Sequence, residues 1–117
     1  MHYGNQEDSE FLKSFVEENV TFDIIIDDGG HSVKQQITSL MHLLPIVRSG
    51  GFYAIEDIYT SYLSTFGGGY RKESTTIEFL KRLVDDIQEG SPEKTTELGQ
   101  RLLSLEISNK ICFFNVK

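Results

Sequence analysis

The feature that most constrains the fold of this chain is an apolar run, FDIIID at residues 22–27, that passes directly into a second aspartate. The run is rich in β-branched residues and too short for a buried helix, so it predicts a strand covered on both faces. A second such run, FYAI at 52–55, ends at Glu56 and Asp57. Two buried strands of this kind are typical of a parallel sheet, in which ligands bind beyond the carboxyl ends of the strands.

Three further segments have apolar residues at helical spacing. We predict helices within 8–18, 32–45 and 75–88, with Pro45 ending or kinking the second one. The predicted buried faces consist of Val33, Ile37, Leu40, Met41 and Leu44 on the second helix and of Ile77, Leu80, Leu83, Val84 and Ile87 on the third.

The remaining segments complete the order of elements. The stretch SGG at 49–51 predicts a turn before the second strand, and LLSLEI and KICFFNVK, with a short turn at Ser108-Asn109, predict a C-terminal hairpin. The order helix, strand, helix, strand, helix, strand, strand predicts an α/β fold. Its parallel sheet is flanked by helices and closed by one antiparallel strand.

Composition narrows the class of protein. The 117 residues suffice for one domain, and the net charge of -7 gives no basic surface for nucleic acid or an anionic membrane. The one cysteine, Cys112, cannot form an internal disulfide and is expected to be a buried core thiol. We find no signal peptide and no apolar run of transmembrane length, so a cytoplasmic domain is expected.

The acidic residues at the ends of the two predicted strands are the candidate functional site of this sequence. If the two strands are neighbours, Asp27, Asp28, Glu56 and Asp57 meet at one edge of the sheet, where they repel and take up protons unless a cation compensates them. Hard oxygen ligands suit magnesium, calcium or manganese, and His31 stands where it could reach whatever the metal holds. The alternative is that Asp-Asp-Gly-Gly is turn chemistry and the acids cap the next helix.

These motifs resemble those of a known family. The segments FDIIIDDGGH, LLPIVRSGGFYAIEDIYTSY and FGGGY look like parts of the metal-dependent sugar O-methyltransferases of macrolide antibiotic biosynthesis, of the mycinamicin and macrocin type. These enzymes are class I S-adenosylmethionine-dependent methyltransferases. The resemblance covers residues 2–70, and the later residues fit in their order of elements. It implies a Rossmann-like sheet of strand order 3-2-1-4-5-7-6, of which residues 1–117 form the C-terminal portion.

The resemblance also implies a role for each acidic residue. Asp28, Glu56 and Asp57 would bind Mg²⁺ or another divalent cation, and His31 would be the general base. Two neighbouring sugar hydroxyls would chelate the cation, which eases loss of their protons, and His31 would accept one near neutral pH. The alkoxide would then attack the sulfonium methyl group. The stretch at 60–70 would be a mobile loop over the substrate or a flexible linker.

On the cofactor side the resemblance is partial. It implies that Gln6 and Asp8, together with Asp28, contact S-adenosylmethionine, because YGNQED resembles a segment near the adenine. The chain has no strand–GxGxxG–helix unit. We therefore expect a fold incomplete at its N-terminus, without strands one and two and inactive alone. The strand predicted at 22–27 would then be an exposed edge that invites self-association.

Three functions stay open at this point. The first is an S-adenosylmethionine- and Mg²⁺-dependent O-methyltransferase, or the C-terminal portion of one, acting on a hydroxyl of a glycoside or another small molecule. The second is a non-catalytic metal-binding or interaction module derived from such an enzyme. The third is a small α/β domain with an unrelated function, in which the acidic residues only shape turns.

Overall fold

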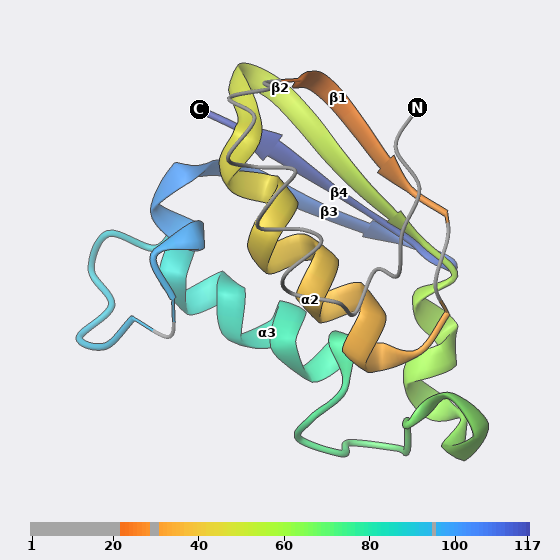
Figure 1. Cartoon of the computed structure of the whole chain (residues 1–117). Helices are drawn as coiled ribbons and strands as arrows, with labels where there is room; N and C mark the ends of the chain where they lie inside the picture. The colour runs from red at the N-terminus through yellow and green to blue at the C-terminus, as the bar shows by residue number, and fades with distance from the viewer. Residues whose placement is uncertain (1–21, 29–30, 95) are drawn as a thin grey trace.

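In the part of the chain that the structure describes, two helices, α2 (Val33–Leu43) and α3 (Thr76–Ile87), cover one face of a four-stranded sheet (Figure 1). The computed structural model describes residues 22–28, 31–94 and 96–117; the helix predicted within 8–18, and Gln6 and Asp8, lie outside these ranges. The elements are β1 (Phe22–Asp27), α2 (Val33–Leu43), η1 (Leu44–Ile46), β2 (Val47–Glu56), η2 (Ile58–Tyr62), η3 (Ser64–Phe66), α3 (Thr76–Ile87), η4 (Leu98–Arg101), β3 (Leu102–Ser108) and β4 (Ile111–Val116). None of these helices is long and apolar enough to cross a membrane.

The sheet has the mixed topology that the order of elements predicts. Its strands lie in the order β1-β2-β4-β3, with β1 and β2 parallel and β4 antiparallel to both of its neighbours. This order matches strands 4-5-7-6 of the implied class I fold. The hairpin is also confirmed, although its turn lies at Asn109-Lys110, one residue later than predicted, with Lys110 at a φ of 70°.

The core lies between the sheet and the two helices. Its largest fully buried side chains include Tyr53 and Phe114, whose rings meet edge to face at 6.0 Å, and Leu40 of α2 and Leu80 of α3. Each such side chain contributes roughly 1.5–3 kcal/mol through burial. Cys112 belongs to this core, as predicted, and burial raises the pKa of its thiol to about 12. The core thus fixes β2 and β4 as the central strands.

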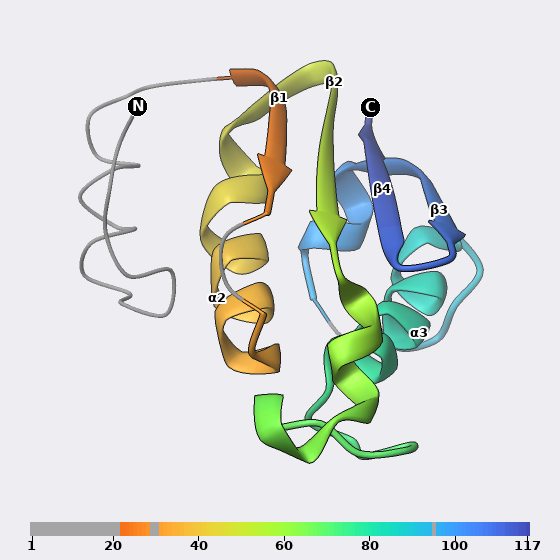
Figure 2. The ribbon, with the colours of Figure 1, turned by 90° about the vertical axis from the view of Figure 1, so that its right-hand side faces the viewer.

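The prediction that β1 is covered on both faces is wrong. Ile25 packs against the core, but Ile24 and Ile26 are 57% and 61% exposed. The reason is that α2 and α3 lie on the same face of the sheet, and no described helix covers the other face (Figure 2). On the helices, Met41 and Val84, both predicted to face inward, are also largely exposed.

The turn predicted at 49–51 is instead part of β2. The pairing of β1 with β2 shifts register between Phe22 and Ile24, so β2 carries extra residues there as a bulge. Gly50 has a φ of +83°, and a Cβ on Gly51 would lie 2.3 Å from the carbonyl oxygen of Asp23. The glycines therefore permit a bulge in a continuous strand rather than a turn that ends it.

Candidate metal and active site

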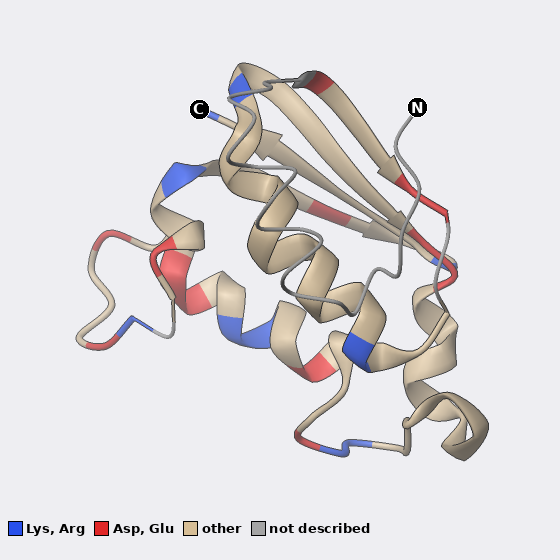
Figure 3. Cartoon of the chain, viewed as in Figure 1, with Lys and Arg blue, Asp and Glu red and all other residues tan. Residues whose placement is uncertain are grey.

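Acidic residues lie together where β1 and β2 end (Figure 3). The two strands are parallel, and Asp27 pairs with Ile55. Asp28 follows Asp27 and Glu56 follows Ile55, so these two acidic residues lie side by side at the end of the sheet. This is the meeting of acidic strand ends that the sequence predicts. Below, "the rim" denotes Asp28, His31, Glu56 and Asp57.

The two consecutive aspartates of β1 face different surroundings. Asp27 is buried and accepts a hydrogen bond of 3.2 Å from the Tyr53 hydroxyl, whereas Asp28 is exposed at the rim. Burial raises the pKa of Tyr53 well above its ordinary value, and the charge of Asp27 and the hydrogen bond to it add to the rise. The hydroxyl therefore stays protonated and holds Asp27 within the sheet, which leaves Asp28 as the aspartate of this pair that can meet a ligand.

Three rim residues converge on one point. Asp28, His31 and Asp57 each offer a ligand atom, and these atoms all lie within 4.8 Å of one another. Nε2 of His31 lies 3.2 Å from Oδ2 of Asp57, with both side chains partly exposed. An imidazole nitrogen and two carboxylates at this spacing can hold a divalent cation or pass a proton between a bound group and the histidine.

Glu56 lies beside this cluster but outside it. A side-chain hydrogen bond to Asp28 raises the pKa of Glu56 most, followed by the charge of Asp28, desolvation and the charge of Asp57. A carboxyl group whose pKa is raised by its acidic neighbours is held close to them against their repulsion, and a divalent cation would relieve that repulsion. The donor set thus fits Mg²⁺, with Asp28 and Asp57 in the cluster and Glu56 adjacent to it.

The backbone at the end of β2 takes an unusual conformation. Asp57 has a φ of 59° and a ψ of 39°, in the left-handed region that a non-glycine residue rarely adopts. Two buried polar side chains contact the carbonyl groups here, Gln36 from α2 and Thr60 from η2. Sequence reasoning missed both, because a polar residue within an apolar pattern has no local signal that it will be buried.

The segment 60–70 after the rim is folded into two short 3₁₀ turns. The ring of Phe66 meets the imidazole of His31 edge to face, with 6.0 Å between ring centroids. A Cβ on Gly68 would lie 2.3 Å from the carbonyl oxygen of Ser61, so this glycine serves a close backbone approach. Tyr62 and Tyr70 stack on one another at 6.4 Å. The segment therefore packs beside His31 through the ring of Phe66.

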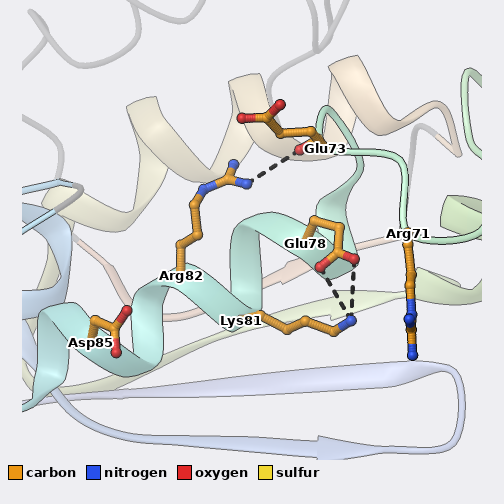
Figure 4. A pocket seen from close by; sticks show the side chains of 6 residues that line it. All are labelled: Arg71, Glu73, Glu78, Lys81, Arg82 and Asp85. Atoms are coloured by element: carbon orange, nitrogen blue, oxygen red, sulfur yellow. Dashed lines mark hydrogen bonds and ion pairs between the residues drawn. The ribbon is translucent and has the colours of Figure 1, made fainter.

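A second charged region lies on α3, and Figure 4 shows its side chains. We call it the α3 hollow; it is lined by Arg71, Glu73, Glu78, Lys81, Arg82 and Asp85. Its charges are matched locally, since Nζ of Lys81 lies 3.1 Å from Oε2 of Glu78 and Arg82 donates to the carbonyl oxygen of Glu73. Such a mixed and exposed surface is typical of a solvated helix face.

Comparison with known proteins adds relatives of defined activity. No family model matches the sequence. The chain is 45% identical to an 8-demethyl-8-(2-methoxy-alpha-L-rhamnosyl)-tetracenomycin-C 3'-O-methyltransferase of Streptomyces olivaceus, over 72% of this chain and 22% of that protein. It is 44% identical to an L-olivosyl-oleandolide 3-O-methyltransferase of Streptomyces antibioticus, over 72% and 23% of the two chains. A mycinamicin VI 2''-O-methyltransferase of Micromonospora griseorubida is 43% identical over 73% and 22%.

A solved structure extends the likeness over nearly the whole chain. It is the MycE methyltransferase from the mycinamycin biosynthetic pathway in complex with Mg, SAH and mycinamycin VI. It superposes with a TM-score of 0.85 at 35% identity, over 98% of this chain and 31% of that one. The four-stranded sheet therefore matches part of a class I methyltransferase fold. The chain spans less than a quarter of the length of the curated relatives that it matches.

Proposed function

We propose that this chain, a homologue of the sugar O-methyltransferases of the mycinamicin and macrocin type, forms the metal-binding and proton-accepting part of such an enzyme. Residues 1–117 would be the C-terminal portion of a methyltransferase domain that uses S-adenosylmethionine and Mg²⁺. Its substrate would be a hydroxyl of a glycoside or of another small molecule. The observation that carries the proposal is the convergence of Asp28, His31 and Asp57 at the ends of two parallel strands.

The carboxylates of the rim would hold the cation. Asp28 and Asp57 have ligand atoms in the cluster, and Glu56 lies against Asp28 with a raised pKa. Mg²⁺ prefers oxygen donors. Among the ion pairs of the described residues, no lysine or arginine reaches these three carboxylates, and the partner of Asp57 is the imidazole of His31. When bound, the cation would lower the pKa of a substrate hydroxyl, and S-adenosylmethionine would supply the methyl group.

His31 would accept the proton of that hydroxyl at Nδ1, because Nε2 faces the carboxylate of Asp57 and is the nitrogen that donates to it. The Asp57 carboxylate, 3.2 Å away, and the edge of the Phe66 ring both restrict the orientation of the imidazole. Histidine is the side chain that most often serves as a general base, because a neutral imidazole can accept a proton on its free ring nitrogen. Because Mg²⁺ binds oxygen in preference to nitrogen, we assign His31 to proton transfer rather than to the metal.

A specific observation favours a second candidate, a non-catalytic metal-binding module. The three residues whose ligand atoms converge are Asp28, His31 and Asp57, whereas the predicted ligand set has Glu56 instead of His31. An imidazole and two carboxylates would suit a softer divalent ion than Mg²⁺. The two candidates differ in whether removal of the imidazole weakens cation binding, and a His31 variant decides this as described in the Discussion.

The proposed cation site can be tested on the 117-residue chain itself. We would titrate Mn²⁺, followed by the paramagnetic signal of the free ion, into the wild type, Asp57→Asn and Asp85→Asn. The last variant makes the same chemical change in the exposed α3 hollow. We expect Asp57→Asn to weaken binding by about tenfold or more, because ligand charge sets affinity, and Asp85→Asn to have no effect. Equal affinity in the wild type and Asp57→Asn would contradict the proposal.

We also propose that the chain self-associates through β1. Within the described residues β1 pairs only with β2, and Ile24 and Ile26 are more than half exposed beside this edge. An edge strand with exposed apolar residues is a ready surface for a second chain, and an added lysine blocks such pairing. Sedimentation velocity should show association of the wild type that Ile26→Lys reduces; a concentration-independent monomer would contradict this.

A further inference from the structure

We infer that Gln36 and Thr60 are positioning residues that hold the segments after β1 and β2, and with them the carboxylates of Asp28 and Asp57, in the arrangement that binds the cation. This inference rests on the proposed metal site and deepens it. Neither residue offers an atom to the ligand cluster, and both are fully buried behind it. Their described hydrogen bonds to the rim all end on backbone carbonyl oxygens, so any effect on the cation must pass through the position of the main chain.

Gln36 anchors the end of β2 to both helices. Its Nε2 donates to the carbonyl oxygens of Glu56 and Asp57, at 3.4 and 3.3 Å. Its Oε1 accepts a hydrogen bond of 2.6 Å from the hydroxyl of Thr76, at the start of α3. Since the amide is held at both ends, it cannot rotate without losing a bond, and it fixes where the two carbonyl groups lie. A buried amide of this kind is retained only where its partners are satisfied.

The anchored backbone is the part of the rim that most needs support. Asp57 lies in the left-handed region, which is strained for a non-glycine residue and persists only where the surroundings enforce it. The direction of the Asp57 side chain, and with it the 3.2 Å contact to His31, follows from this conformation. Release of the carbonyl group would allow Asp57 to relax toward ordinary backbone angles and move its carboxylate.

Thr60 ties the two halves of the rim together. Its Oγ1 lies 2.6 Å from the carbonyl oxygen of His31 and 3.1 Å from that of Asp57. The hydroxyl has one proton, so it donates to one carbonyl group at a time, and the shorter distance favours His31. This is a direct bond between the segment that follows β1 and the segment that follows β2. The spacing of the ligand cluster therefore depends on a residue that lies outside it.

The test compares Mn²⁺ affinity across paired variants of the whole chain. Gln36→Leu and Thr60→Val remove the contacts, and Thr60→Ser keeps the hydroxyl. Thr96→Val makes the same change at another partly buried hydroxyl, which donates to Asp86 near the C-terminal end of α3. Loss of an outer partner of a metal site costs about 10–100-fold in affinity, so we expect this loss for Gln36→Leu and Thr60→Val. Thr60→Ser should restore binding, and Thr96→Val should only lower the melting temperature.

Each outcome distinguishes between explanations. Affinity is measured well below the melting temperature of each variant. If Gln36 and Thr60 only stabilise the fold, their variants would melt at a lower temperature but bind Mn²⁺ as tightly as the wild type. That result would overturn the inference. An equal loss of affinity in Thr96→Val would overturn it as well, because the effect would then reflect general destabilisation. If Gln36→Leu does not fold, the Thr60→Val and Thr60→Ser pair decides. Failure of the wild type to bind Mn²⁺ would instead remove the proposed metal site, and the positioning role with it.

Discussion

The rim and the α3 hollow are both rich in charge, but they balance it in different ways. In the hollow, Lys81 pairs with Glu78 and Arg82 donates to a carbonyl group, so opposite charges are matched along one helix. At the rim, carboxylates from two strands meet, and none of the ion pairs between described residues brings a lysine or arginine to them. The partner of Asp57 is an imidazole, which carries charge only when protonated.

The two regions also differ in what lies behind them. The hollow is lined by exposed and partly buried side chains of one helix and its preceding loop. The rim is instead backed by buried polar groups such as Tyr53, Gln36 and Thr60. Like charges held together by a buried scaffold favour the proposed cation site. Mixed charges without such support indicate a solvated surface.

The largest difference between the regions should appear in turnover. In a complete enzyme that contains this chain, His31→Ala should lower the turnover number about hundredfold, because a general base contributes an effect of this size. The same replacement in the hollow, Lys81→Ala, should leave turnover unchanged. Steady-state kinetics with S-adenosylmethionine measures both.

The cation affinity of His31→Ala separates the two candidate functions. If His31 is the base, Mn²⁺ affinity should stay close to that of the wild type while turnover falls. A drop in affinity as large as that of Asp57→Asn would make the imidazole a ligand and favour the non-catalytic module. Unchanged turnover would remove the catalytic role.

Next in size is the effect of Glu56 on cation binding. Glu56→Gln should weaken Mn²⁺ binding by about tenfold, since it removes one negative charge beside Asp28. Its counterpart in the hollow, Glu78→Gln, should not change the affinity. Isothermal titration calorimetry on the two variants gives the comparison, and an unchanged affinity in Glu56→Gln would restrict the ligand set to the three residues whose ligand atoms converge.

A smaller effect should appear in the pH dependence of stability without metal. The pKa of Glu56 is raised in the folded chain, so the folded state binds this proton more strongly than the unfolded chain does. The contribution of Glu56 to stability is therefore fully present below its unfolded pKa of about 4.3 and is lost as the pH rises through the folded value. Glu56→Gln should thus melt at a higher temperature than the wild type at pH 7, and the difference should vanish near pH 4.

Added cation provides a control for this pH dependence of the melting temperature. Added Mn²⁺ should reverse the order at pH 7, because it stabilises the wild type more than the variant. A difference between the two melting curves that is the same at pH 4 and pH 7 would show that proton binding by Glu56 does not cause it.

The smallest expected effect belongs to the hollow. Lys81→Ala removes an exposed pair at i,i+3 spacing, which contributes about 0.5 kcal/mol or less to the free energy of unfolding. Urea denaturation should therefore give nearly the same free energy for the variant and the wild type. A loss of several times that size would mean that the hollow has a structural role and would weaken its contrast with the rim.

Local patterns in the sequence are sufficient to predict the elements that lie around the core. Strand β1, both helices and the hairpin follow from apolar spacing, and helix α2 ends before Pro45 as predicted. The spacing does not decide which residues at the margin of an apolar stripe are buried. Met41 and Val84 face outward because neighbouring elements, rather than the helix itself, determine where the core stops.

The sequence predicts the part of the candidate site that follows from where the two strands end. Parallel strands finish at one edge, so acids that follow β1 and β2 had to meet. The spacing of residues alone does not separate Asp27 from Asp28. The resemblance gave the metal role to Asp28, and the hydrogen bond from Tyr53 to Asp27 supplies a physical reason for that choice. Gln36 and Thr60 could not be found, since the partners of their side chains, except Asp57 as a partner of Thr60, lie about 20 to 40 residues away in the sequence and no local pattern connects them.

The central claim is that the rim, and not the α3 hollow, holds a divalent cation. The most direct measurement is an anomalous difference map from crystals of this chain soaked in Mn²⁺. The account predicts one strong peak bounded by the carboxylates of Asp28 and Asp57, which is absent in crystals of Asp57→Asn. A map with no peak at these carboxylates, or with its strongest peak among the side chains of the α3 hollow, would contradict the account.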